Sequence, residues 1–291
     1  MGCRRLVETD FAMRLILSRK GFDSTSGGCP SPIFPDGSMF ALPIPDKNSP
    51  IRYRDLIWRG RNIGDVVERL TKGKQRGHYA AHLDPDVRPE LRDRAPGWKP
   101  LLGQHGSAQG HLRNQEVGVG DLFLFWGLFR AVDGDLNWVG PRLHVIWGWL
   151  RVGAAAAVED VVRPGIGGDW SWAADHPHLA FGTDATNTLY VAADRLQLRG
   201  GDQAGAGVFD FFAPSRQLTA PGSTSPLTWV LPGWFLPEGR PALSYHGKPS
   251  CWTKRGGVAL LRVAARGQEF VLDASEYPEA EEWALGLIRS A

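Results

Sequence analysis

Short apolar segments separated by polar, glycine-rich stretches dominate this chain, and that alternation is typical of a β-rich fold. Leu15-Ile16-Leu17 is an apolar run that stops abruptly at Ser18, which predicts a buried strand leading into a polar loop. Two longer runs rich in aromatic residues, 121–130 and 143–152, flank the turn-forming sequence DGDLN and predict a β-hairpin or meander.

Helical periodicity is confined to two segments. Asn62 is an N-cap candidate, and the apolar residues that follow it up to Thr71 recur at helical spacing. The segment 277–290 is amphipathic and carries acidic residues in its first turn, as the helix dipole favours. In the second half of the chain the pattern predicts short strands, at 188–192, 208–212, 227–231, 258–262 and 270–272.

Two segments carry no sustained period. Residues 21–37 combine glycine, proline and small hydroxyl residues, which predicts a loop. The return segment 40–44 is predicted to be an edge-type strand, because Pro43 and Pro45 cannot donate to a ladder. Residues 76–115 are polar and rich in Gly, His and Pro, and we interpret them as a long functional loop, since the segment is not of low complexity.

Neither an internal repeat nor an obvious linker divides the chain. We expect a single α+β domain over residues 13–291, predominantly β with few helices, after a disordered leader at 1–12, with Met13 as an alternative start. Gly120-Asp121, followed by the strand HVIWGWLRV, resembles the small barrels of the PUA, ASCH and EVE superfamily. That resemblance implies a PUA-like small-barrel or meander element and binding of a modified base or structured RNA.

The composition indicates what class of protein this is but says little about its function. With 43% hydrophobic and 22% charged residues, the chain is an ordinary folded protein. A formal net charge of +2 is too balanced for strong sequence-independent DNA binding, yet it allows a local basic patch or a small anionic substrate. Three widely spaced cysteines without a CxxC pair indicate reduced thiols and a cytoplasmic location. We expect no membrane association, because no apolar run reaches the roughly 20 residues of a span.

The glycine-rich loop after the first strand is the first candidate site. Its glycines let backbone N–H groups approach a ligand, and its side chains suit an anionic group. The candidate binding residues are Lys20, Asp23, Ser24 and Ser26. The motif GxxxxGK[ST] is absent, and a tight structural crossover is the alternative interpretation. Cys29 in the same loop is more simply a buried thiol than a nucleophile.

A second candidate is the sequence HLDPD. His82 and Asp84 point the same way in an extended segment, and a carboxylate beside an imidazole suits acid–base catalysis or a divalent metal. Asp86 would add a third oxygen ligand, whereas an Asp-Pro turn with solvated charges is the alternative. The later sequence DHPH has HxH spacing, but the intervening Pro177 favours an ordinary turn, and His246 is a strand-end residue that could join the site in space.

The segment GQHGSAQGHLRNQ is the third candidate, because clustered amides can read base edges. Its candidate binding residues are Gln104, Gln109 and Asn114, and a polar network that holds a long loop is the alternative. The chain also has twelve tryptophans. Those near polar loops, Trp98, Trp126, Trp147 and Trp149, could stack on bases, although most tryptophans in folded proteins fill the core.

Taken together, LILSRKGFDSTSGGCPSPIFPDG, HLDPD, GQHGSAQGHLRNQ and VGDLFLFWGLFR resemble the nucleotide modification associated domain family of the third type. The resemblance covers residues 13–152 well, and HPHL, WVLPGWF and LSYHG match more loosely. It implies a nucleotide or nucleic-acid context, with partner proteins of a base-modification system, and it supplies no mechanism.

The leading hypothesis is an enzyme or accessory subunit that acts on a modified base or nucleotide. Lys20 and the loop would bind phosphate, the three amides would read the base, and His82 with Asp84 would transfer protons or hold a metal. The rival is a non-catalytic reader that binds a modified base through a PUA-like pocket, and a third reading is a scaffold in a modification or defence complex. The sequence leaves open the catalytic status, cofactor, metal, substrate and oligomeric state.

Overall fold

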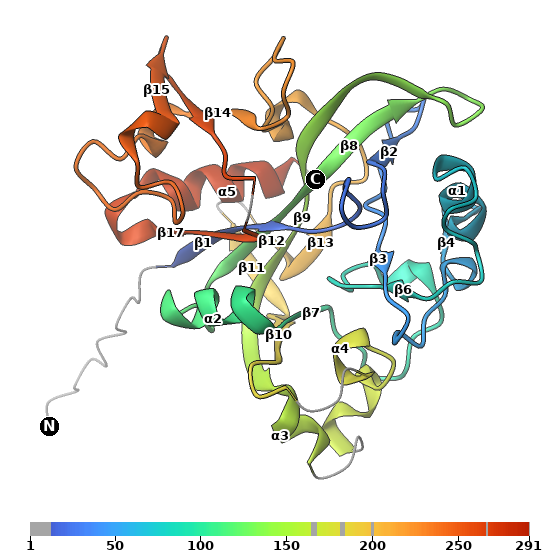
Figure 1. The fold of residues 1–291 in the computed structure, drawn as a ribbon. Helices are drawn as coiled ribbons and strands as arrows, with labels where there is room; N and C mark the ends of the chain where they lie inside the picture. The colour runs from blue at the N-terminus through green and yellow to red at the C-terminus, as the bar shows by residue number, and fades with distance from the viewer. Residues whose placement is uncertain (1–12, 164–167, 181–183, 199–200, 266, 291) are drawn as a thin grey trace, which may run out of the picture.

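A large curled β-sheet forms the centre of the protein, with few helices around it (Figure 1). The computed structural model describes residues 13–163, 168–180, 184–198, 201–265 and 267–290, so the predicted leader at 1–12 lies outside the described residues. The described part is predominantly β, as the sequence predicts. None of its helices is both long and apolar enough to cross a membrane.

The central sheet has eight strands, six of which follow one path in the order β17-β1-β8-β9-β10-β7. β2 pairs with β8, and β13 pairs with β9, beside this path. The bounds are β1 Arg14–Arg19, β2 Ser31–Ile33, β7 Leu101–Gln104, β8 Leu122–Val132, β9 Trp138–Ala157, β10 Thr188–Ala192, β13 Ala206–Val208 and β17 Glu269–Asp273.

The β8–β9 hairpin is confirmed and is the longest feature of the sheet. The two strands pair antiparallel from Leu122 opposite Arg151 to Val132 opposite Trp138. β1, which the sequence also predicts, lies parallel to the first half of β8 and antiparallel to β17. Because β1 is flanked by strands and buried on both faces, it is a continuous apolar run rather than an alternating one.

The curl of the sheet brings its two edge strands back together. Gln104, the last residue of β7, donates its side-chain N–H to Oε1 of Glu269, the first residue of β17, at 2.6 Å, and both side chains are buried. Helix α2 (Gly106–Asn114) follows β7 directly and packs against β17, with Leu112 in the main core. Residues 165 positions apart in the chain thus meet at this edge.

The prediction that residues 76–115 form one long loop is wrong. The segment contains β6 (Ala81–His82), β7 and α2. Helix α2 cannot be predicted from the sequence pattern, because Gln109 and Leu112 are its only buried residues and no apolar period marks it. Its two glycines, Gly106 and Gly110, also disfavour a helix. Its helical structure therefore depends on packing against the sheet.

The two predicted helices are confirmed. α1 (Ile63–Leu70) begins as expected, because Asn62 Oδ1 accepts a hydrogen bond from the backbone N–H of Gly64 at 2.8 Å. α5 (Glu279–Arg289) packs its small and apolar residues against the main core. The remaining helices, α3 (Val158–Val162) and α4 (Pro177–Ala180), are too short to show a period.

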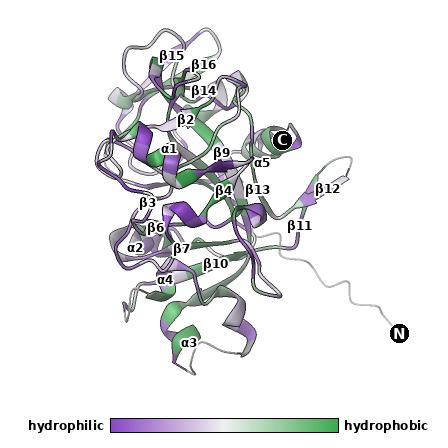
Figure 2. Cartoon of the chain, turned by 90° about the vertical axis from the view of Figure 1, so that its right-hand side faces the viewer, coloured by the Kyte–Doolittle hydropathy of each residue, from purple (hydrophilic) through white to green (hydrophobic). Residues whose placement is uncertain are grey.

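Smaller sheets surround the central one. They are β3 (Ile44–Pro45) with β6, β4 (Ile57–Trp58) with β5 (Arg61–Asn62), β11 (Arg195–Leu198) with β12 (Gly201–Ala204), and β14 (Thr228–Pro232) with β16 (Val258–Arg262) and β15 (Trp252–Arg255). β11 and β12 stand out from the body of the protein (Figure 2). The pair β3–β6 matters most for the site, since it holds His82 opposite Ile44.

Most of the predicted late strands are confirmed as β10, β14, β16 and β17. Two predictions are wrong in extent: β13 ends at Val208, and the segment 40–44 contributes only its last residue to β3. Proline at position 43 removes a ladder donor, and the carbonyl of Leu42 accepts instead from the backbone N–H of Phe22. The predicted loop 21–37 contains the short strand β2, which pairs along the distal half of β8 despite Pro32.

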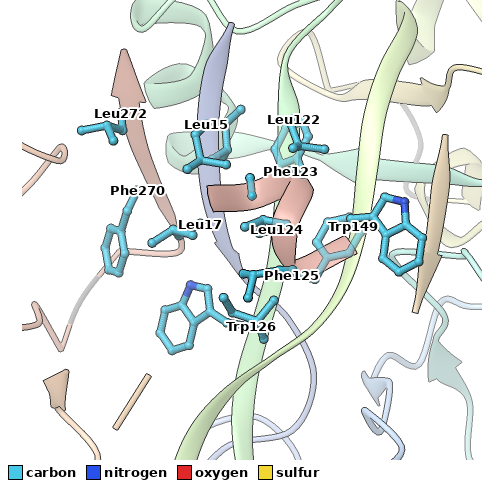
Figure 3. Close-up of a cluster of buried hydrophobic side chains, with 14 of the residues drawn as sticks. Leu15, Leu17, Leu122, Phe123, Leu124, Phe125, Trp126, Trp149, Phe270 and Leu272 are labelled. Atoms are coloured by element: carbon cyan, nitrogen blue, oxygen red, sulfur yellow. The ribbon is translucent and has the colours of Figure 1, made fainter. Parts of the chain in front are cut away.

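The main core lies along β1, β8 and β17. In Figure 3 the leucines of β1 lie beside the aromatic run of β8 and beside Phe270 and Leu272 of β17. Trp147 and Trp149 are at most 6% exposed and pack on Phe125 and Phe209, so they serve as core residues. Trp98 stacks with the guanidinium of Arg94 away from this core.

Candidate functional site

One cavity of about 680 Å³ collects most of the residues that the sequence singles out. It lies where β1 runs into the glycine-rich loop, beside the β3–β6 pair and the end of β7. Seven of the nine predicted site residues line it, namely Lys20, Asp23, Ser24, Ser26, His82, Asp84 and Gln104. Three stretches distant in the chain therefore converge on a shared cavity.

Asp23 holds the glycine-rich loop in shape. Its Oδ1 accepts hydrogen bonds from the backbone N–H groups of Thr25 at 2.6 Å and Ser26 at 2.7 Å, and from the Thr25 hydroxyl at 2.7 Å. Burial alone would raise the pKa of the Asp23 carboxyl, but these bonds and the ion pair with Arg19 outweigh it and lower the pKa. Asp23 is thus an organiser of the loop, and it leaves Ser24 exposed at the cavity.

Replacing Asp23 by alanine is expected to lower the free energy of unfolding by about 2 kcal/mol near neutral pH, because hydrogen bonds to a carboxylate are lost. The folded-state pKa is depressed, so this contribution exists above the unfolded-state pKa and disappears as the pH falls through the folded-state pKa. Urea unfolding near neutral pH and in acid measures the effect. A stability difference between native protein and variant that stays constant in acid would contradict the assignment.

Asp84 lies at the closed end of the cavity, with a side chain only 2% exposed. Its Oδ1 accepts a hydrogen bond from the backbone N–H of Gly103 at 2.6 Å and lies 3.4 Å from Nε2 of His176. Its Oδ2 lies 3.5 Å from Nζ of Lys20. Burial alone would raise the pKa of the Asp84 carboxyl, but the Lys20 charge and the neighbouring histidines hold it well below its usual range.

Two histidines approach the other side of Oδ2. Nε2 of His82 and Nε2 of His178 each lie 3.9 Å from it. On the far side of each ring an acceptor faces Nδ1: Asp46 Oδ2 at 2.9 Å for His82, and Asn187 Oδ1 at 2.6 Å for His178. Asn187 also donates to the His178 carbonyl, which fixes its amide orientation. Both rings are therefore oriented so that Nδ1 faces its acceptor and Nε2 points at Asp84.

The histidines of the DHPH sequence are the main feature that sequence reasoning misses. The sequence favours an ordinary turn here, and this prediction is wrong, because Pro177 is the first residue of α4, a position that proline favours. The helix turns both His176 and His178 inward, where each side chain is 2% exposed. Burial lowers the pKa of His178 to about 3, so this imidazole is neutral at physiological pH. The HxH spacing is the only signal that could have indicated this.

Glu269 is a second carboxyl that the sequence gives no reason to select. Its Oε1 lies 3.7 Å from Lys20 Nζ and accepts from Gln104, and its side chain is 1% exposed. Burial raises its pKa despite the nearby ammonium. Lys20 therefore lies between two carboxyl groups of opposite tendency, since the pKa of Asp84 is lowered and that of Glu269 is raised.

Another part of the cavity lining is basic and aromatic. Arg19 and the exposed Arg142 line it, together with Trp126 and His144. Trp126 is also packed against Trp229, whose indole N–H donates to Nδ1 of His144 at 2.8 Å, so this wall is rigidly built. The lining thus combines the exposed Arg142 and Ser24 with the buried Asp84 cluster.

His82, Asp84 and His178 also form a set of atoms that could hold a metal ion. Their Nε2, Oδ2 and Nε2 atoms all lie within 4.8 Å of one another. Two imidazoles and one carboxylate suit a divalent transition metal. Asp86 is not part of this set, because its carboxylate makes a two-point ion pair with Arg94, at 2.6 and 2.7 Å.

The comparison with protein-family models matches residues 14–273 to nucleotide modification associated domain 3. The chain belongs to this family. The resemblance inferred from short motifs is thereby confirmed, and the match includes every residue that lines the cavity. No curated protein and no solved structure matches the chain. The family description indicates a role in nucleotide modification and names no reaction.

Within this family member, two predicted binding residues lie away from the cavity. Gln109 exchanges hydrogen bonds with the hydroxyl of Tyr190 inside the protein, and Asn114 is exposed at the end of α2. His246 does not join the site, because its ring nitrogens contact the carbonyl of Ser244 and the N–H of Ala264. Cys29 is a buried thiol, and burial raises its pKa to about 12.

Proposed function

We propose that this protein binds a nucleotide, free or within a nucleic acid, in the 680 Å³ cavity and acts on its base during nucleotide or DNA modification. The observation that carries the proposal is the convergence of Lys20, His82 and Asp84 on one cavity in a member of this family. Packing does not require charged and imidazole groups at that place. Burying them costs free energy, so their presence favours a functional role.

The charge distribution supports an orientation for the nucleotide. Arg142 and the hydroxyl of Ser24 are exposed at the cavity and suit the phosphate. Lys20 lies deeper, between Asp84 and Glu269, so we assign it to the reacting end rather than to the phosphate. Gln104 remains in the proposal as the amide that lines the cavity, whereas Gln109 and Asn114 are left out of it.

The chemistry assigned to the inner end is proton transfer at the base. We assign the proton transfer to His82, since Asp84, whose pKa is held well below its usual range, is a poor proton acceptor and acts as a fixed negative charge. Asp46 orients the His82 ring through Nδ1, as a carboxylate does in many acid–base pairs. A nucleobase placed at this end would contact Asp84 and the imidazole rings of His82 and His178 together.

A reader that binds a modified base without converting it, through a PUA-like pocket, is the alternative. The aromatic residue that bears on it is Trp126, which lines the cavity but is only 1% exposed, with the Arg19 guanidinium over its ring, so stacking on a base requires Arg19 to move. Incubation of the protein with nucleotides and DNA, followed by mass spectrometry of the bases, separates the two. A mass change that Asp84→Asn abolishes supports the enzyme, and tight binding without any mass change under every cofactor condition tested supports the reader.

Reversing the charge of Arg142 is expected to weaken nucleotide binding by roughly 10-fold or more, since that corresponds to about 1.4 kcal/mol of lost phosphate contact. Calorimetric titration of Arg142→Glu with deoxynucleoside monophosphates measures this. Arg255→Glu is the matched control, because Arg255 is also exposed and lies outside the cavity lining, and the substitution changes the net charge by the same amount. If the two variants bind the nucleotide with equal affinity, Arg142 does not contact the phosphate.

A further inference from the structure

We infer that His82, Asp84 and His178 bind a divalent first-row transition-metal ion at the inner end of the cavity. The three residues come from β6, the segment after it, and α4, and their facing atoms lie within 4.8 Å of one another. The inference rests on the proposed function only in taking this cavity as the place where a nucleotide binds. The metal would then lie beside the base.

The orientation of the two rings carries the argument. Nδ1 of each ring faces an oxygen, from Asp46 or from Asn187, so each Nε2 points toward Asp84 Oδ2. Two imidazole nitrogens and one carboxylate oxygen thus converge on a common point, which is the donor arrangement that a divalent ion binds. An acceptor behind each ligating imidazole is the arrangement that fixes ligand histidines in metalloproteins.

Asp84 is prepared as a ligand in the same way. Its Oδ1 is held by the backbone N–H of Gly103 and faces His176, so Oδ2 is the oxygen left to the two rings and Lys20. Ligands of a tetrahedral ion lie roughly 3.4 Å apart, so the two Oδ2–Nε2 distances of 3.9 Å have to shorten by about half an ångström and the two Nε2 atoms, which lie within 4.8 Å of each other, have to move closer as the ion binds. The remaining coordination positions would face the cavity, which the three residues line.

The donor set limits the metal. Imidazole nitrogens select transition ions over Mg²⁺ and Ca²⁺, which prefer all-oxygen sites, and a two-histidine, one-carboxylate set with open positions is typical of non-haem Fe²⁺. Zn²⁺, Mn²⁺ and Co²⁺ share this chemistry. Neither of the two cysteines in the described residues belongs to this set, since Cys29 lies in a separate buried cluster and Cys251 packs against the main core.

Lys20 makes the inference sharply testable. Its ammonium lies 3.5 Å from the same Oδ2 that the metal would use, so it competes electrostatically with the ion. Removing this charge by Lys20→Met is therefore expected to strengthen metal binding, whereas removing a ligand weakens it. A purely structural role for the cluster predicts no such opposite effects.

The test uses the full chain, stripped with a chelator and titrated with Fe²⁺, Mn²⁺, Co²⁺ and Zn²⁺ by calorimetry, with the visible absorption of Co²⁺ as a second readout. We expect one ion per chain. His82→Ala and His178→Ala should lower the affinity by roughly 100-fold, and Asp46→Ala, which removes only an orienting acceptor, by roughly 10-fold with a changed Co²⁺ spectrum. His111→Ala is the control, since this half-buried histidine on α2 lies outside the cluster.

Absence of binding in the native chain, or equal loss in His111→Ala and Asp46→Ala, would overturn the inference. Affinity for Lys20→Met below that of the native chain would also count against it. Nucleotide titration in the presence of chelator keeps the two proposals apart: nucleotide binding without metal binding refutes only the metal site, and metal binding without nucleotide binding refutes only the proposed function.

Discussion

Asp84→Asn is expected to lower the free energy of unfolding by about 3 kcal/mol, because it removes one partner of a buried ion pair and leaves the Lys20 ammonium without its main counter-charge. Both side chains are at most 9% exposed, so solvent cannot compensate. The substitution preserves size, and the expected loss therefore reflects charge rather than a cavity. Urea denaturation followed by tryptophan fluorescence measures it.

A double substitution tests the origin of that loss. Asp84→Asn combined with Lys20→Met removes both charges, and it should be more stable than Asp84→Asn alone by at least about 1 kcal/mol. Asp175→Asn is the control, since Asp175 pairs with Arg92 at the surface, where an ion pair contributes about 0–1 kcal/mol. If Asp84→Asn proves no more harmful than Asp175→Asn, the buried pair does not stabilise the fold.

Gly103→Ala is expected to lower metal affinity by roughly 10- to 100-fold although it removes no ligand. A Cβ at Gly103 would lie 2.2 Å from the ring of His178, so this ring has to move away from Asp84. The crowding should also cost about 1–3 kcal/mol of stability. Calorimetry with Co²⁺, together with urea denaturation, measures both effects.

Gly110→Ala on the neighbouring helix is the matched control. A Cβ at Gly110 meets nothing within 4 Å, and replacing a helical glycine by alanine should raise stability by about 0.5–1 kcal/mol without any change in metal affinity. A Gly103→Ala variant that binds metal like the native chain would mean that His178 is not a ligand. A change of the same sign in both variants would point to a general effect on β7 and α2.

The site is built at the place where the sheet closes on itself. Gln104 and Glu269 join its two edge strands, and Lys20 at the end of β1 lies between Glu269 and Asp84. Chemistry at the cavity is therefore coupled to the closure of the sheet, and substitutions at Gln104 or Glu269 act on both. This coupling is why variants that leave the edge strands intact, such as Arg142→Glu, are the cleaner tests of ligand binding.

The local pattern of the sequence was sufficient for the elements that depend on apolar periodicity. The β8–β9 hairpin, β1 and α1 follow from runs of buried side chains, because burial repeats with the period of a strand or helix. The motif blocks were sufficient for the family. His82 and Asp84 face each other as their spacing predicts, but for another reason: β6 ends at His82, and a tight turn closed by the Asp84 N–H and the His82 carbonyl brings the two side chains together.

Only the tertiary structure decided which other side chains join that pair. His178 and Glu269 reach the cavity because α4 begins at Pro177 and because the curled sheet returns β17 beside β7. The same packing directs Gln109 to the hydroxyl of Tyr190 and leaves Asn114 on the surface. The sequence gives no reason to distinguish these two amides from Gln104. The physical reason is that helix α2 derives its stability from contact with the sheet rather than from its own residues, so its orientation is a property of the assembled fold.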